Sequence, residues 1–284
     1  MASRNAMDLS HKLALITGGS SGIGFALAEK LASQGANVWL LARREDRLKQ
    51  AVGALELKAI GADQVFGYLA ADVADKESLF AVLSRFSSEV GTPDILVNSA
   101  GASRPGQFEA LEPELFEELM RTNYLGTVYT TRAVIRGMIN RRSGTIVNIS
   151  SIAGFIGVYG YSAYGATKYA VRGFSDVLRA EMKPRGIRVS VVFPPDTETP
   201  QLAGEEPYKP EVTRELSGTA KPLSATQVAD AILRGVSRGR YVITPGLDGS
   251  LLFKASNLLG AGIYPLMDYL VRQAMRKHHL PEEA

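Results

Sequence analysis

Short apolar runs that alternate with helical stretches are the feature that most constrains how this chain can fold. The first unit is a strand over 13–18, a glycine-rich turn, and a stretch over 22–34 whose apolar residues recur at helical spacing. Further strands are predicted over 37–41, 64–69, 95–98, 145–150, 189–193 and 240–244, with helices over 44–57, 76–90 and 164–183 and two helical stretches around 115–141. This alternation predicts parallel strands joined by crossover helices.

The predicted strands are continuously apolar rather than alternating. Runs such as 13–16 and 189–193 have this character, which is typical of strands covered by helices on both faces. We therefore predict an α/β fold: a Rossmann domain with a doubly wound, seven-stranded parallel sheet. With 284 residues and no internal repeat or linker, we expect one domain over 1–284, with its core at about 12–245.

Composition excludes several classes of function. The chain has no cysteine, so disulfides, thiolate nucleophiles and sulfur-bound zinc are excluded. Its three histidines are not spaced as metal ligands, and its basic residues are interspersed with acids at a net charge of +3, so we expect neither a metal nor nucleic acid. Residues 1–12 are polar and lack the apolar core of a secretory signal, so we expect a cytoplasmic protein.

A glycine-rich loop lies between the first predicted strand and the first helix. It reads Thr17-Gly18-Gly19-Ser20-Ser21-Gly22-Ile23-Gly24. In this pattern Gly18 permits the tight turn, Gly22 lets the backbone approach a pyrophosphate, and Gly24 lets helix and strand pack closely. Ser20, Ser21 and Ile23 complete the candidate contacts. An ordinary glycine turn is the alternative, but the position at a helix N-terminus favours a dinucleotide.

The end of the second predicted strand indicates which dinucleotide is used. An acid there would bind the ribose hydroxyls of NAD, but this chain has Ala42, followed by Arg43 and Arg44. Arginine pairs with phosphate through charge-assisted hydrogen bonds, so the pattern predicts NADP(H) with Arg43 as the main contact. The alternative is that these arginines form surface pairs with Glu45 and Asp46.

Tyr164 and Lys168 are four residues apart in a predicted helix, which puts both side chains on one face. We expect the ammonium to depress the pKa of the phenol towards neutrality, so that Tyr164 can exchange a proton. A tyrosine and a lysine at this spacing are also common on helix surfaces, so the pair needs further support.

That support comes from the order of several motifs, which resembles the short-chain dehydrogenase/reductase family over about residues 12–244. The shared motifs are the glycine loop, an Asn-x-Ala-Gly turn at Asn98, a serine thirteen residues before the tyrosine, and the Tyr-x-x-x-Lys pair. The resemblance implies that Tyr164 is the general acid and that Ser151 holds the carbonyl oxygen. It also implies that Lys168 binds the nicotinamide ribose and that Asn123 supports proton transfer through water molecules.

The resemblance implies further contacts to the cofactor. The turn contributes Ala100 and Gly101 beside Asn98, with Ser99 departing from the family's asparagine. Asp72 and Val73 would meet the adenine, although a surface aspartate beside a buried valine is the alternative. After the sixth predicted strand, the candidates are Pro194, Thr197 and Thr199, and simple turn-stabilising hydroxyls are the alternative for the two threonines. Pro195 replaces the usual glycine and stiffens this turn.

Three segments indicate the class of substrate. The sequences over 194–200, 123–126 and 161–164 resemble a group within the family that reduces the sphingoid ketone 3-ketosphinganine with NADPH. The partner implied is therefore an apolar ketone built on a long-chain sphingoid base. A 3-oxoacyl thioester or a steroid remains an alternative substrate, and a non-catalytic NADP-sensing protein is the alternative from another class. The family also implies a homo-oligomer.

Two segments lie outside the nucleotide-binding motifs. Residues 201–223 are rich in proline, glycine and charge, and we expect either a substrate lid or a passive surface loop. Residues 246–284 are apolar but interrupted by charges, and they end in Arg272, Arg276, Lys277, His278 and His279. This extension is too broken to cross a bilayer. Peripheral contact with an anionic membrane and packing against another subunit are the two expectations.

Overall fold

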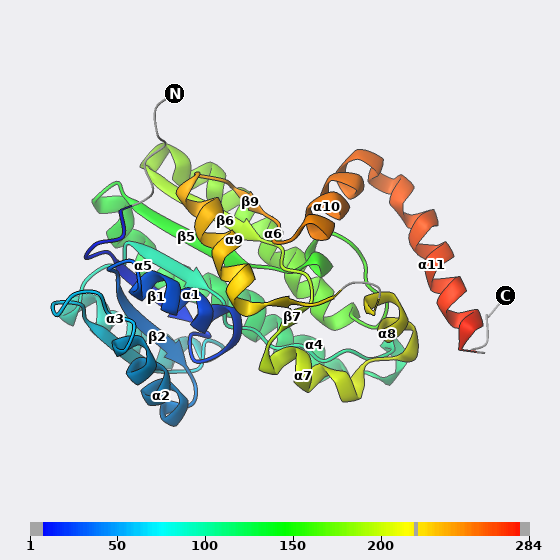
Figure 1. The fold of residues 1–284 in the computed structure, drawn as a ribbon, viewed down its shortest axis with the longest axis horizontal. Helices are drawn as coiled ribbons and strands as arrows, with labels where there is room; N and C mark the ends of the chain where they lie inside the picture. The colour runs from blue at the N-terminus through cyan, green and yellow to red at the C-terminus, as the bar shows by residue number, and fades with distance from the viewer. Residues whose placement is uncertain (1–7, 219–220, 279–284) are drawn as a thin grey trace.

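A computed structural model describes residues 8–218 and 221–278 of the chain. A seven-stranded parallel sheet in the order β3-β2-β1-β4-β5-β6-β9 forms its centre (Figure 1). The strands are β1 (Leu13–Thr17), β2 (Asn37–Ala42), β3 (Phe66–Ala70), β4 (Ile95–Asn98), β5 (Gly144–Ile149), β6 (Ile187–Val192) and β9 (Val242–Ile243). The strand order reverses at β1, which pairs with β2 on one side and β4 on the other, and ligands bind at such a switch point.

Helices cover both faces of this sheet. One face packs against α1 (Gly22–Ala32), α2 (Glu45–Glu56) and α9 (Ala225–Ser237), and the other against α3 (Lys76–Glu89), α5 (Gly126–Asn140) and α6 (Ser162–Met182). Successive residues of β1 serve opposite faces: Ala14 and Ile16 lie in the first apolar cluster, and Leu15 in the second. The predicted doubly wound Rossmann sheet is confirmed.

The predicted strands and helices agree with the observed ones to within a few residues. The main difference lies in the stretch around 115–141, which contains α4 (Pro113–Leu119), a π-helical turn over Met120–Leu125, and then α5. The sequence did not indicate that turn. Single π-helical turns often occur at functional sites, and this one carries Asn123.

The segment expected to be a lid or a loop is largely helical. It contains α7 (Pro200–Glu205), a 3₁₀ turn over Glu206–Tyr208 and α8 (Glu211–Ser217). It is bracketed by a two-stranded sheet in which β7 (Thr197–Glu198) pairs with β8 (Leu223–Ser224). These helices lie to the lower right of the sheet in the view of Figure 1. Movement of the segment over a substrate stays a prediction.

The C-terminal extension forms α10 (Leu247–Leu259) and α11 (Ile263–Lys277), joined by a short turn, and α11 projects from the body of the molecule (Figure 1). Phe253 of α10 packs against Phe155 and Phe193, and Lys277 of α11 pairs with Glu215 of α8 at 2.7 Å. Within residues 8–218 and 221–278, no helix is long and apolar enough to cross a membrane. His279 lies outside the described residues.

Candidate active site

The glycine loop connects β1 to α1 at the carboxyl edge of the sheet. Gly18 has a φ of +65°, and a Cβ on it would lie 2.8 Å from the Cα of Ala100. Gly24 approaches the carbonyl oxygen of Gly18 so closely that its Cβ would lie 2.6 Å away. Both positions therefore exclude a side chain. The resulting cradle, with the N-terminus of α1 behind it, fits the pyrophosphate of a dinucleotide.

Thr17 ties this loop to the neighbouring turn. Its hydroxyl oxygen accepts hydrogen bonds from the backbone N–H groups of Ser99 and Ala100, each at 3.1 Å. Gly101 follows, and a Cβ there would lie 3.3 Å from the side-chain oxygen of Asn123 and 3.5 Å from the Lys168 ammonium. The loop, the turn and the predicted catalytic residues therefore form one continuous site.

The residues predicted to select the cofactor lie at the ends of β2 and β3. Arg43 is exposed, and its guanidinium lies 3.9 Å from the carboxylate of Asp72. The other oxygen of that carboxylate accepts a hydrogen bond from the Ala74 N–H at 2.9 Å. Val73 is buried and packs against Gly126. Arg43 is thus free to turn towards a ligand, since its only contact with Asp72 is long and exposed to solvent.

Helix α6 carries Tyr164 and Lys168 on one face. The Lys168 ammonium lies 5.4 Å from the centre of the Tyr164 ring and donates a hydrogen bond to the Ile149 carbonyl at 3.1 Å. Lys168 is buried and Tyr164 is half-buried. The backbone carbonyl at the end of β5 therefore holds the Lys168 ammonium in position beside the Tyr164 phenol.

Ser150 and Ser151 lie next to each other but make different contacts. The Ser150 hydroxyl is buried and donates to the backbone carbonyl of Lys168 at 2.9 Å, which ties α6 to β5. The Ser151 hydroxyl instead accepts a hydrogen bond from the Ala153 N–H at 3.2 Å, and it lies close enough to Tyr164 to lower the pKa of the phenol. Successive side chains of extended backbone point to opposite faces, so the two neighbouring serines serve different parts of the structure.

Burial has the largest effect on the pKa values of Tyr164 and Lys168. It lowers the pKa of Lys168 to about 8, opposed by the negative charge of Glu205. Burial also raises the pKa of Tyr164, and the charge of Glu205 raises it further, while hydrogen bonds from Ser151 and Gln201 act in the opposite direction. The expectation that the pKa of Tyr164 is depressed towards neutrality by Lys168 is therefore wrong for the protein alone, because desolvation of the phenolate and the charge of Glu205 raise this pKa and the lysine is not among the groups that lower it.

Asn123 is buried in the π-helical turn and is held by three hydrogen bonds. Its amide group donates to the Ala102 carbonyl and to the Thr167 hydroxyl, each at 2.9 Å, and its oxygen accepts from the Ala102 N–H at 2.8 Å. Thr167 lies next to Lys168 on α6. Asn123 therefore joins the turn after β4 to the catalytic helix, and its role in a proton path stays a prediction.

Several predicted cofactor contacts are also engaged within the protein. Asn98 is buried and donates to Thr131 at 3.0 Å and to Asn148 at 2.8 Å, so its side chain belongs to the sheet interior. Thr197 donates to the Pro195 carbonyl at 2.8 Å, and Thr199 caps α7 by accepting from the Leu202 N–H at 3.3 Å. The threonines thus stabilise turns, which was the alternative reading for both. The Pro194 carbonyl accepts from the Ile152 N–H at 3.1 Å.

Three residues beside Tyr164 were not singled out from the sequence. The ring of Tyr161 lies 5.7 Å from that of Tyr164, and its hydroxyl donates to the Glu205 carboxylate at 2.7 Å. Gln201 donates to the other oxygen of Glu205 at 3.0 Å. Gln201 and Glu205 fall within the segment 201–223, which was expected to be a substrate lid or a surface loop. No local pattern marked either residue as part of the active site.

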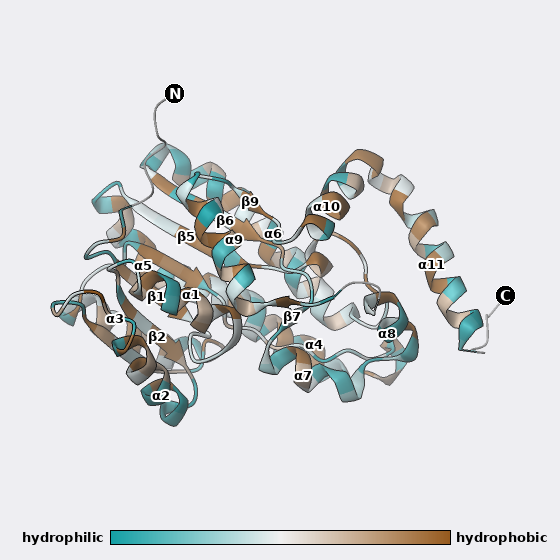
Figure 2. Cartoon of the chain, viewed as in Figure 1, coloured by the Kyte–Doolittle hydropathy of each residue, from teal (hydrophilic) through white to brown (hydrophobic). Residues whose placement is uncertain are grey.

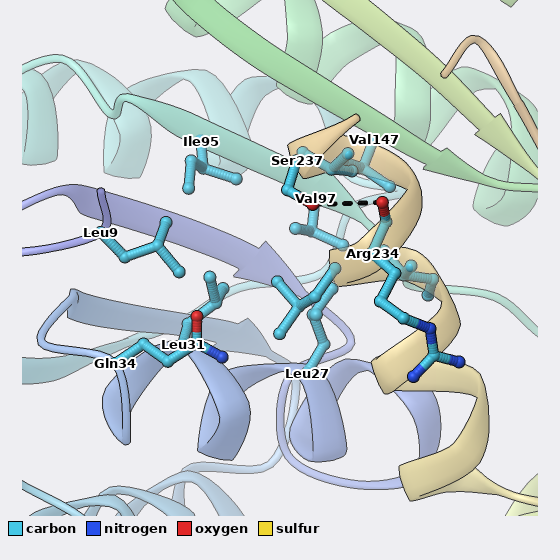
Figure 3. Close-up of a pocket in the computed structure, with 12 residues that line it drawn as sticks. Leu9, Leu27, Leu31, Gln34, Ile95, Val97, Val147, Arg234 and Ser237 are labelled. Carbon is cyan, nitrogen blue, oxygen red and sulfur yellow. Dashed lines mark hydrogen bonds between the residues drawn. The ribbon is translucent and has the colours of Figure 1, made fainter. Parts of the chain in front are cut away.

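A cavity of about 170 Å³ lies away from these residues. It is lined mainly by apolar side chains between α1, α9 and the central strands, among them Leu27, Leu31 and Val147 (Figure 3). Those side chains belong to the sheet face opposite α6. The cavity therefore contributes nothing to the candidate active site.

Comparison with known proteins agrees with this geometry. The family model for "short chain dehydrogenase" matches residues 12–209. The mouse protein named 3-ketodihydrosphingosine reductase is 43% identical over 84% of this chain and 72% of its own length, and the zebrafish 3-dehydrosphinganine reductase is 41% identical over 89% and 76%.

Solved structures give the same result. A short-chain dehydrogenase from Sphingobium yanoikuyae in complex with NADPH is 30% identical, with a TM-score of 0.76 over 89% of this chain and 94% of its own. A short-chain dehydrogenase from Streptomyces avermitilis is 28% identical, with a TM-score of 0.77 over 93% and 98%. The chain therefore belongs to the short-chain dehydrogenase/reductase family of nicotinamide-dependent oxidoreductases.

Proposed function

We propose that this protein is an NADPH-dependent reductase that converts 3-ketosphinganine to sphinganine. The observation that carries the proposal is the 43% identity, over 84% of the chain, to a mouse protein named for this reaction. That match extends over both the nucleotide-binding half and the catalytic half of the fold. The juxtaposition of Ser151, Tyr164 and Lys168 supplies the chemistry that such a reaction needs.

The reaction adds one hydride and one proton to a ketone. A nicotinamide held by the glycine loop at Gly18 and Gly24 would supply the hydride. Tyr164 donates the proton to the carbonyl oxygen, and the Ser151 hydroxyl donates a hydrogen bond to the same oxygen as its negative charge develops. The Lys168 ammonium stabilises the tyrosinate left behind, and that tyrosinate is reprotonated from solvent through the polar groups around Asn123.

NADPH is the preferred cofactor in this proposal. Arg43 extends from the end of β2 with 73% of its side chain exposed, and Ala42 leaves no acid at the position that would bind the ribose of NAD. A guanidinium there pairs with a 2′-phosphate but gains little from a 2′-hydroxyl.

We further propose that the enzyme works in the cytoplasm, with α10 and α11 resting on an anionic membrane surface. Figure 2 shows apolar residues along both helices where they leave the body of the molecule. Exposed large apolar residues there are Leu247, Leu251, Leu258, Leu259, Tyr264, Leu266 and Tyr269. The exposed charged residues of the two helices are Lys254, Arg272, Arg276 and Lys277 against Asp248 and Asp268, a positive balance that suits an anionic surface. A long-chain ketone would reside in such a membrane.

Vesicle sedimentation tests this surface. Vesicles that contain anionic lipid are expected to retain the protein, and replacement of Leu258 and Leu259 by serine is expected to release it without loss of turnover in micelles. If the vesicles retain nothing and the same substitutions convert an oligomer to a monomer, the surface is a subunit interface. That result would support the predicted homo-oligomer and overturn the membrane proposal.

NADPH oxidation by the purified protein tests the main proposal. The substrates are 3-ketosphinganine in detergent micelles and, in parallel, a 3-oxoacyl thioester, each repeated with NADH. We expect turnover of the sphingoid ketone with NADPH. Turnover of the thioester alone would support a reductase activity but reject the sphingoid ketone as its substrate. Equal rates with NADH and NADPH would reject the predicted preference for NADPH.

A further inference from the structure

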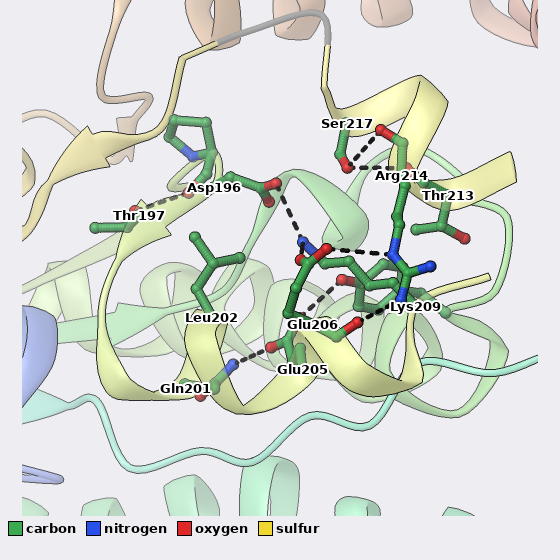
Figure 4. A network of polar contacts seen from close by, with 12 residues as sticks. Asp196, Thr197, Gln201, Leu202, Glu205, Glu206, Lys209, Thr213, Arg214 and Ser217 are labelled. Atoms are coloured by element: carbon green, nitrogen blue, oxygen red, sulfur yellow. Dashed lines mark hydrogen bonds and ion pairs between the residues drawn. The ribbon is translucent and has the colours of Figure 1, made fainter. Parts of the chain in front are cut away.

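Glu205 is a buried carboxylate at the end of α7, and only 6% of it is exposed. One of its oxygens accepts from the Tyr161 hydroxyl at 2.7 Å, and the other accepts from the Gln201 amide at 3.0 Å. Figure 4 shows Gln201 and Glu205 side by side on α7. Both hydrogen-bond donors are neutral, and the mechanism above uses neither of them.

The neighbouring residue provides a contrast. Glu206 lies 3.3 Å from the Lys209 ammonium and 3.2 Å from the Arg214 guanidinium. Among the described residues, by contrast, no lysine, arginine or histidine nitrogen comes within 4.0 Å of the Glu205 carboxylate. A buried carboxylate is costly unless a cation or several hydrogen bonds compensate it. Two neutral donors leave it able to accept a cation.

Glu205 also lies close to the reacting groups. The Tyr161 ring, whose hydroxyl holds the carboxylate, is 5.7 Å from the ring of Tyr164. Gln201 donates a hydrogen bond to Glu205 and also lies close enough to Tyr164 to lower the pKa of the phenol. The charge of Glu205 raises the pKa values of both Tyr164 and Lys168, so the carboxylate acts on the two residues that handle the proton.

We propose that Glu205 binds the ammonium group of a 2-amino ketone whose carbonyl oxygen is held by Tyr164 and Ser151. The inference rests on the proposed function, because 3-ketosphinganine carries its ammonium on the carbon next to the carbonyl carbon. Two covalent bonds separate that nitrogen from the carbonyl carbon, so a carbonyl held at Tyr164 brings the ammonium into the same small volume. A 3-oxoacyl thioester and a steroid ketone have no cation there.

This arrangement would make Glu205 a specificity-determining residue. A site built to bind a polar group discriminates against analogues that lack it, because the buried partner is then left without its counter-charge. Binding of the ammonium would also offset the negative charge that raises the pKa of Tyr164, and so make the phenol a better proton donor once the correct substrate is bound.

The test compares two ketones of equal chain length with wild-type protein, Glu205→Gln and Glu206→Gln. The ketones are 3-ketosphinganine and its analogue without the amino group. In Glu205→Gln we expect kcat/KM for the amino ketone to fall about 10- to 100-fold, the range of a lost hydrogen bond to a charged group, while kcat/KM for the analogue does not fall. Glu206→Gln, on the adjacent residue, is expected to change neither. NADPH binding by fluorescence verifies that each variant is folded.

Other outcomes separate this inference from the proposed function. If wild-type protein reduces neither ketone, both are overturned. If it reduces the amino ketone, but Glu205→Gln loses both ketones equally or loses neither, only the role of Glu205 is overturned. A measurement on wild-type protein alone guards against a variant that does not fold: sphinganine is expected to inhibit at least about tenfold more strongly than the corresponding diol without nitrogen, and equal inhibition would overturn the inference.

Discussion

The ammonium of Lys168 lies 5.4 Å from the centre of the Tyr164 ring, one helical turn away on α6. A hydrogen bond to the Ile149 carbonyl at the end of β5 holds the ammonium at that position. Burial lowers the pKa of this lysine to about 8 and raises that of the tyrosine. Both groups are therefore neutral over a wider pH range in the folded protein than they would be in water. Burial of these two groups therefore lowers the free energy of unfolding, as is common at catalytic sites.

Loss of the proton donor is the most direct test of the mechanism. We expect Tyr164→Phe to bind NADPH normally but to lose about 100-fold or more in kcat, because the substitution removes the hydroxyl and almost no volume. The matched control is Tyr169→Phe on the same helix, whose side chain is exposed and which should keep full activity. Undiminished kcat in Tyr164→Phe would refute the assigned role.

The lowered pKa of Lys168 makes a prediction about stability. Between about pH 8 and 10.5 an unfolded chain keeps the lysine proton that the folded chain has lost, so Lys168 makes stability rise with pH in this window. We expect cofactor-free Lys168→Met to be more stable than wild type at pH 7, by up to about 3 kcal/mol, with the difference shrinking by pH 9.5.

Denaturant unfolding at the two pH values measures this effect. Lys183→Met, at the exposed end of the same helix, is the control and should show no such change. The raised pKa of Tyr164 has the opposite effect on stability, but only above about pH 10, where an unfolded tyrosine begins to ionise. A difference between Lys168→Met and wild type that stays constant with pH would contradict the assignment.

Cofactor choice depends on the end of β2. We expect Arg43→Ala to reduce the preference for NADPH over NADH by about tenfold or more, because a charge-assisted pair with the 2′-phosphate is lost. Arg44→Ala is the control, since Arg44 is the exposed residue that precedes α2. The ratio of kcat/KM values for the two cofactors reports the effect, and equal changes in both variants would mean that neither arginine selects the phosphate.

The glycine loop makes a steric prediction. A Cβ at Gly18 would lie 2.8 Å from the backbone of Ala100, and the residue has a φ of +65°, so we expect Gly18→Ala to lower both stability and NADPH affinity. Gly53→Ala lies in the middle of α2, where the new Cβ would meet nothing within 4 Å beyond its own stretch of helix, and it should instead raise stability by about 0.5 to 1 kcal/mol. Thermal unfolding and cofactor titration separate the two effects, and a harmless Gly18→Ala would show that the loop has room to move.

Much of this molecule could be predicted from local patterns. The apolar runs that became β1 and β6, and the spacing of Tyr164 and Lys168, depend only on residues close together in the chain, because strand and helix periodicities are local. The doubly wound sheet followed from their alternation. The π-helical turn around Asn123 could not be predicted in this way, since it is held by contacts with Ala102 and Thr167 that lie 21 and 44 residues away.

The sequence by itself determined the Rossmann fold, the family and the order of the motifs, because each depends on short-range pattern. Only the tertiary structure decided the electrostatics of the site. It brought Glu205 from α7 to the hydroxyl of Tyr161, 44 residues earlier in the chain, and it buried Lys168 and half-buried Tyr164 so that desolvation, rather than their mutual spacing, has the largest effect on their pKa values. Burial and approach between distant segments are properties of the packed chain, and no local pattern encodes them.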